Sequence, residues 1–174
     1  MTVDNKIAIV SAIISFISML IAIFFSKKSS LASQQSLENA EKANHIAIGQ
    51  TETSLREQIM LARQRMEDIG FKIQEVLRDR EIDNLSNEEK YHIDFLKKSW
   101  NSAVEGYLNT HEDACGKFLD KKTDPDRFKK IYVNEIRNIC DPSNNSYARL
   151  MHPDSTSKFE AIWKVYRQWH KHEY

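Results

Sequence analysis

The sequence predicts an all-α protein with one N-terminal transmembrane helix, a long helical stalk and a C-terminal bundle of three or four helices. A 19-residue stretch without charge lies near the N-terminus, strong helix formers follow it, and helical apolar spacing continues toward the C-terminus. Only 4 Gly and 3 Pro occur in 174 residues, which argues against a turn-rich β fold. We assign the three parts to residues 1–29, 30–85 and 86–174.

The charge and cysteine composition excludes several classes of protein. The 25 Lys and Arg residues balance 25 Asp and Glu residues, whereas nucleic-acid-binding domains usually present a basic face. Two cysteines, Cys115 and Cys140, are too few for a disulfide scaffold, and free thiols suit a reducing cytoplasm. We therefore expect no nucleic-acid partner.

The predicted membrane span runs from Ile7 to Phe25. As a helix, its nineteen residues reach roughly 28 Å, close to the hydrocarbon thickness of a bilayer. A cleaved signal peptide is the alternative, but the uncharged stretch is longer than a usual signal core and is preceded by little net positive charge. Because Lys27 and Lys28 follow the span and only Lys6 precedes it, we expect the N-terminus outside and the C-terminal domain in the cytoplasm, at the inner (plasma) membrane.

Small side chains form a stripe along the span at alternating spacings of 3 and 4. This small-residue stripe consists of Ala8, Ser11, Ser15, Ser18 and Ala22. Small residues let helix backbones approach closely in a bilayer, so the stripe favours self-association. The alternative is that Ala and Ser are merely tolerated in the span.

The stalk carries an apolar seam with heptad spacing. The seam consists of Leu55, Ile59, Ala62, Met66, Ile69, Ile73 and Val76, and Glu52 interrupts its continuation toward the N-terminus. Two structures satisfy it: a parallel coiled coil between copies, or one helix packed on the C-terminal helices of its own chain. The additional apolar residues Leu61, Phe71 and Leu77 widen the apolar face, which favours packing within the chain. A homo-oligomer remains an open alternative.

The C-terminal part shows several helix boundaries. Ser86 and Glu89 form a capping box, and Asp124-Pro125 is a second start signal. The helix after Ser86 either pauses at Asn109-Thr110 or continues to Leu119. A break is expected at residues 140–145, and Pro153-Asp154-Ser155 is expected to open a last helix. The residues expected on the buried helix faces include Tyr91, Phe95, Leu96, Trp100, Ala103, Val104, Tyr107, Leu108, Phe128, Ile131, Tyr132, Ile136, Ile139, Phe159, Ile162, Trp163, Tyr166 and Trp169.

Five short motifs stand in a characteristic order between residues 95 and 170. They are Tyr107-Leu108-Asn109, Ala114-Cys115, Asp126-Arg127-Phe128-Lys129, Glu135-Ile136-Arg137 and Tyr166-Arg167-Gln168-Trp169. This region resembles uncharacterised bacterial single-pass membrane proteins with a compact helical C-terminal domain, some of them labelled as phage abortive-infection proteins. The resemblance implies a role in phage defence or in a mobile element. Its motifs are mainly apolar and aromatic, so it implies no catalytic residues.

Candidate chemistry is sparse. His111 and Cys115 share one helix face and can present two metal ligands, but no third ligand is apparent, so we expect a surface histidine beside a core cysteine. His170 and His172 are expected on a solvated tail, both thiols in the core, and the pairs Lys121-Lys122 and Lys129-Lys130 on a solvated face.

The sequence also lacks the motifs of common enzymes. It contains no phosphate loop, dinucleotide fingerprint or serine hydrolase elbow. We expect a non-enzymatic protein without cofactor, bound metal or small-molecule substrate, whose partners are the bilayer and an unidentified protein. The expected function is a membrane-anchored interaction protein. The alternative is an oligomerising effector that perturbs the bilayer in abortive infection or superinfection exclusion.

Overall fold

The computed structural model of the protein describes residues 3–78 and 82–170, with the side chains of residues 3–13 and of Asp83 left out. The described parts contain helices and no strand, which confirms the all-α class. The α-helices are α1 (Val3–Leu77), α2 (Asn87–Leu119), α3 (Pro125–Cys140), α4 (Ala148–Met151) and α5 (Glu160–Trp169), with short 3-10 turns at Ile82–Asn84 and Asp154–Thr156. The chain forms two compact units, Met1–Ala47 and Ile48–Tyr174.

The first unit consists of the N-terminal part of α1. Every side chain described in it, from residue 14 to residue 47, is exposed. α1 is long and apolar enough to cross a membrane by length and composition: within residues 14–77 an 18-residue window has a mean hydropathy of 1.4, and none of that window is buried. Phe25, the predicted end of the span, lies in this exposed segment, whereas the side chain of Ile7 lies outside the described residues.

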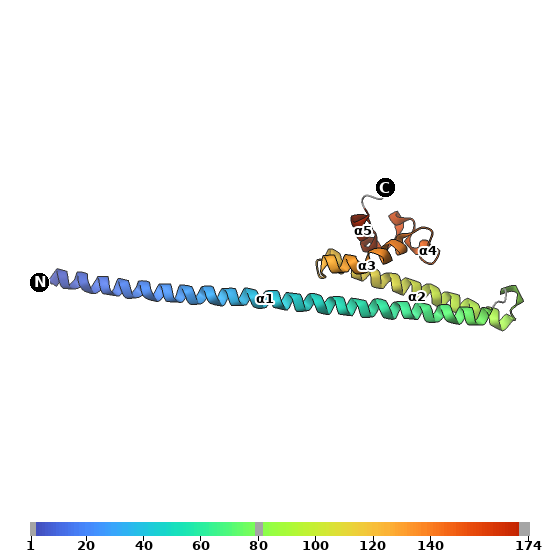
Figure 1. The fold of residues 1–174 in the computed structure, drawn as a ribbon, viewed down its shortest axis with the longest axis horizontal. Helices are drawn as coiled ribbons and strands as arrows, with labels where there is room; N and C mark the ends of the chain where they lie inside the picture. The colour runs from blue at the N-terminus through green and yellow to red at the C-terminus, as the bar shows by residue number, and fades with distance from the viewer. Residues whose placement is uncertain (1–2, 79–81, 171–174) are drawn as a thin grey trace. The chain divides into compact units, whose positions relative to one another are not determined.

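The second unit is built on a helical hairpin. From residue 48 onward α1 runs alongside α2, which returns antiparallel to it, and α3, α4 and α5 pack near the C-terminal half of α2 (Figure 1). The core draws on all five helices and includes Leu55, Ile59, Val104, Leu108, Cys115, Phe128, Ile136, Ile139, Met151, Phe159, Ile162 and Val165. The two helices of the hairpin approach each other closely at Gly70, where an added Cβ would stand 3.0 Å from the Trp100 ring.

Local sequence signals set the starts of α2 and α3. The predicted capping box is confirmed, since Ser86 accepts a hydrogen bond from the N–H of Glu89 and the Glu89 carboxylate accepts one from the N–H of Ser86. Asp124 caps α3 through the N–H of Arg127, with Pro125 at the first helical position. α2 continues through residues 109–110 to Leu119 without a pause.

The last helix begins later than the sequence predicts. Pro153-Asp154-Ser155 opens only a 3-10 turn, and α5 starts at Glu160. No residue beside this start caps it. Instead the Glu112 carboxylate on α2 accepts hydrogen bonds from the N–H groups of Ala161 and Ile162, at 2.8 and 3.0 Å. The boundary is therefore set by a residue about 50 positions away, which local signals do not reveal.

The predicted buried face of α2 is wrong in its first turns. Tyr91 and Phe95 are 80% and 61% exposed, whereas Ile93 and Leu96 are 1% and 5% exposed. Each exposed ring is two positions from Ile93, which turns it roughly 160° away around the helix. Since α1 is the one described helix that runs along this half of α2, only one narrow face is buried there (Figure 1). Ile131, also expected in the core, is 41% exposed.

Candidate functional site

Four polar side chains from three helices meet in the second unit. Glu135 on α3 accepts hydrogen bonds from the Arg63 guanidinium on α1 and from the Tyr107 hydroxyl on α2, and His111 Nε2 lies 3.4 Å from its Oε1. Arg63 also donates to the Tyr107 hydroxyl oxygen over 3.4 Å. We call these four residues the Glu135 hub. It joins the stalk helix to the two helices that pack on it.

His111 is the most buried member of the hub, with 1% exposure. The expectation of a surface histidine is therefore wrong. Its ring lies against the Tyr107 ring, with centroids 4.4 Å apart, and Nδ1 is 3.0 Å from the carbonyl oxygen of Tyr107. Both ring nitrogens thus face oxygen atoms of the same unit.

The hub sets the charge of Glu135. Burial raises the pKa of its carboxyl, but hydrogen bonds from His111 and Tyr107, together with the charges of His111 and Arg63, outweigh burial and lower the pKa to about 2. Glu135 is therefore ionised at neutral pH. Burial, reinforced by the hydrogen bond to Glu135, raises the pKa of the Tyr107 phenol, so Tyr107 remains a hydrogen-bond donor.

An open cleft of about 490 Å³ lies over the hub. α1, α2, α3 and the segment after α3 all contribute to it, through Arg63, Met66, Glu67, Tyr107, Ile131, Asn134, Glu135, Asn138 and Tyr147. Arg63, Tyr107 and Glu135 belong to both the hub and the cleft wall. The hub therefore fixes the floor of an accessible depression.

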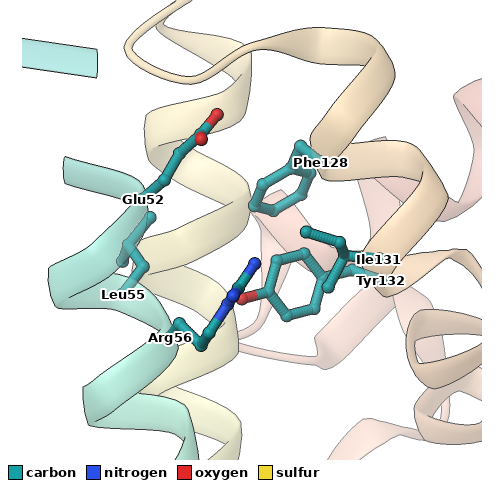
Figure 2. Close-up of a pocket in the computed structure, with 6 residues that line it drawn as sticks. All are labelled: Glu52, Leu55, Arg56, Phe128, Ile131 and Tyr132. Atoms are coloured by element: carbon teal, nitrogen blue, oxygen red, sulfur yellow. The ribbon is translucent and has the colours of Figure 1, made fainter. Parts of the chain in front are cut away.

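A second, smaller depression lies between α1 and α3, nearer the start of α3. Figure 2 shows Glu52, Leu55 and Arg56 on α1 facing Phe128, Ile131 and Tyr132 on α3. Its volume of about 10 Å³ is room for roughly one water molecule. Ile131 lines both depressions, so they follow one another along the contact between α1 and α3. We call this pair of depressions the α1–α3 groove.

Glu52, which interrupts the heptad pattern, fastens α1 to the start of α3. Its Oε1 accepts from the N–H of Asp124 over 2.8 Å, and its Oε2 accepts from Arg127 over 2.7 Å. The Glu52 side chain is 15% exposed. The apolar pattern stops there because the position bonds to a helix N-terminus of the same chain rather than to an apolar side chain.

The seam packs within the chain in this structure. Leu55 and Ile59 are buried in the core, Ala62 and Met66 pack against it, and Ile69, Ile73 and Val76 are half-buried. Leu61 and Phe71, however, are 61% and 67% exposed, so they do not widen the packed face as expected. In the small-residue stripe, Ser15, Ser18 and Ala22 are exposed, while the side chains of Ala8 and Ser11 lie outside the described residues.

The remaining candidates do not form a reactive centre in the described residues. Cys115 and Cys140 are buried free thiols, and burial raises the pKa of Cys140 to about 12 and that of Cys115 well above its usual range. His170 is 4% exposed beside Arg137, so the expected solvated tail is wrong there, and His172 lies outside the described residues.

Within the described part of the chain, no three His, Cys, Asp or Glu side chains are placed to hold a metal ion. The paired lysines at 121–122 and 129–130 are exposed.

Sequence reasoning missed Glu135 and its partner Arg63. One signal for Glu135 was present: it lies three residues after Tyr132 and one before Ile136, so a charged residue sits at the edge of the buried face of α3. No local pattern marks Arg63, whose partners are 44 and 72 positions away.

Comparison of the chain with family models, with curated proteins and with solved structures finds no match. The hub and the groove therefore carry the functional argument by their own chemistry.

Proposed function

We propose that this protein is a membrane-anchored helical interaction protein. Residues 7–25 span the inner membrane with the N-terminus outside, and residues 48–174 form a cytoplasmic domain that binds another protein. One observation supports this most strongly: the apolar side chains of residues 14–25 are all exposed, while the second unit buries an apolar core of its own.

The exposed apolar segment requires an apolar medium. Twelve Ile, Val, Leu and Phe residues in Ile7–Phe25 favour insertion by very roughly 4–7 kcal/mol in total. A domain held at a surface meets partners at a higher effective concentration, so anchoring strengthens weak recognition. The open cleft over the Glu135 hub offers a place for such recognition.

An oligomerising effector that perturbs the bilayer is the second candidate. The exposed Ser15, Ser18 and Ala22 favour it, because small residues at alternating spacings of 3 and 4 allow close helix contact in lipid. The resemblance of residues 95–170 to proteins labelled for abortive infection supports a role in phage defence or a mobile element for either candidate.

Cysteine labelling tests the anchor and its orientation. Because both native thiols are buried, they react slowly, and a single introduced cysteine reports its own side of the membrane. In intact spheroplasts, an impermeant maleimide is expected to label Asn5→Cys and not Ser36→Cys; permeabilisation should expose both. Labelling of Ser36→Cys alone would reverse the orientation, and recovery of the chain in the soluble fraction would refute the anchor.

Overexpression separates the two candidates. The effector predicts loss of membrane potential on overexpression, and its relief by Ser15→Leu, which fills the stripe. Ser26→Leu, beyond the span, serves as the matched control. An unchanged membrane potential at high expression would refute the effector, and the anchored interaction protein would be the remaining candidate.

A further inference from the structure

The α1–α3 groove has the length and polarity of a binding site for extended chain. Its lining on α1 runs from Glu52 to Glu67, and its lining on α3 rises in the same direction, from Phe128 to Asn138. Fifteen residues of helix span about 22 Å. An extended chain rises about 3.3 Å per residue, so roughly six or seven residues of it match this length.

The wall formed by α3 carries amide groups at a suitable spacing. Asn134 and Asn138 are one helical turn apart, about 6 Å, which is close to the roughly 6.6 Å between alternate residues of an extended chain. Asn144 Nδ2 donates to Asn138 Oδ1 over 3.0 Å, which orients the Asn138 amide. An Asn side chain both donates and accepts, as does a peptide group, so each can bond to the backbone of a bound segment.

Arg56 and Glu67, which line different depressions of the groove, carry opposite charges, and the charge of Glu52 beside Arg56 is compensated by Arg127. Arg56 lines one depression and Glu67 lines the other, both are exposed, and neither forms an ion pair with a described residue. Between them, the charges of Arg63 and Glu135 compensate each other within the hub. Eleven helical positions separate Arg56 from Glu67, about 16 Å, which corresponds to roughly five extended residues.

We propose that the α1–α3 groove binds an extended peptide segment, with an acidic side chain near Arg56 and a basic side chain about five residues away near Glu67. The inference rests on the proposed function and specifies its partner. Extended chain is favoured over a helix because a helix has already paired its backbone groups and would leave Asn134 and Asn138 without peptide partners. Ile131, 41% exposed between the two depressions, offers an apolar contact for a side chain in the middle of the segment.

A displayed library of random decapeptides, selected on the full chain in lipid nanodiscs, tests the proposal. Empty nanodiscs are the blank. We expect enriched sequences to carry an acidic and a basic residue about five positions apart, in one order. The charge-swapped variant Arg56→Glu/Glu67→Lys changes two exposed side chains and should enrich the reverse order. No enrichment over empty nanodiscs, or the same order with both proteins, would overturn the proposal.

Binding of one enriched peptide, measured by fluorescence anisotropy, tests the role of the Asn134 and Asn138 amides. Asn134→Ala/Asn138→Ala should weaken binding about tenfold or more, as expected for two lost hydrogen bonds. Asn109→Ala, an exposed asparagine of α2 outside the groove, should change it less than about twofold. Equal effects of the two variants would show that the Asn134 and Asn138 amides do not bind the peptide.

These outcomes are distinct from those of the proposed function. If the chain labels as an N-out membrane protein but selects no peptide, the proposed anchor stands and the peptide-binding role of the groove is refuted. If the chain is found in the soluble fraction but selects the peptide, the peptide-binding role of the groove stands and the proposed anchor is refuted.

Discussion

The two units of the chain treat apolar side chains in opposite ways. In residues 14–47 each large apolar side chain is exposed, with Phe24 and Phe25 at 67% and 63%. In the second unit the core side chains are of the same kinds but almost fully covered, with Leu108 and Ile136 at 0%. Apolar composition alone therefore does not place a residue in a protein core. The apolar side chains of the first unit need an apolar medium outside the chain, whereas those of the second unit are covered by the unit's own core.

A cavity in the second unit should have the largest effect on stability. Ile136→Ala is expected to lower the free energy of unfolding by about 4 kcal/mol, because a fully buried side chain is removed from a packed site. Leu37→Ala in the first unit, where Leu37 is 64% exposed, should change it by less than about 0.5 kcal/mol. Urea titration of the full chain in detergent micelles measures both. Equal losses would mean that the two units share one core.

Acid should weaken the second unit through the Glu135 hub. The pKa of Glu135 is lowered from 4.5 to about 2, so its contribution is fully present above pH 4.5 and is lost as the pH falls toward 2. The loss is about 3 kcal/mol at most by linkage. Urea titrations between pH 5 and pH 2.5 should show this slope, and Glu135→Gln should flatten it. An unchanged slope in Glu135→Gln would assign the acid sensitivity to other carboxylates.

The cap that α2 provides for α5 should have an intermediate effect. Glu112→Ala leaves the N–H groups of Ala161 and Ile162 without their acceptor, at an expected cost of about 2 kcal/mol. Asp113→Ala, next in sequence, removes only an exposed ion pair with Lys117 and should cost about 0.5 kcal/mol or less. Thermal unfolding followed by circular dichroism compares the pair. Similar costs would show that α5 does not depend on Glu112.

The smallest predicted effect distinguishes two glycines of α1. Gly49→Ala should stabilise the protein by about 0.8 kcal/mol, because alanine favours helix and nothing lies within 4 Å of the added Cβ. Gly70→Ala gains the same propensity but presses its Cβ to 3.0 Å from Trp100, so the gain should disappear. The same unfolding experiments detect the difference, and two equal gains would indicate a Trp100 ring free to move aside.

Wherever the cause is local, the sequence was sufficient. The starts of α2 and α3 follow from Ser86, Glu89, Asp124 and Pro125, which bond to or shape the backbone within three residues. The long uncharged stretch likewise identifies the one described helix that is long and apolar enough to cross a membrane. Helix formation and lipid compatibility depend on composition and short spacing, so both can be read along the chain.

Only the tertiary structure decided which polar residues matter. Glu52 caps α3 from 72 positions away, Glu112 caps α5 from about 50, and Glu135 joins Arg63 on α1 to His111 on α2. In sequence each looks like an ordinary polar residue of a helix, and Tyr91 looks more buried than His111. A buried polar group is stable only beside its partner, and that partner is set by how distant helices pack rather than by neighbours along the chain.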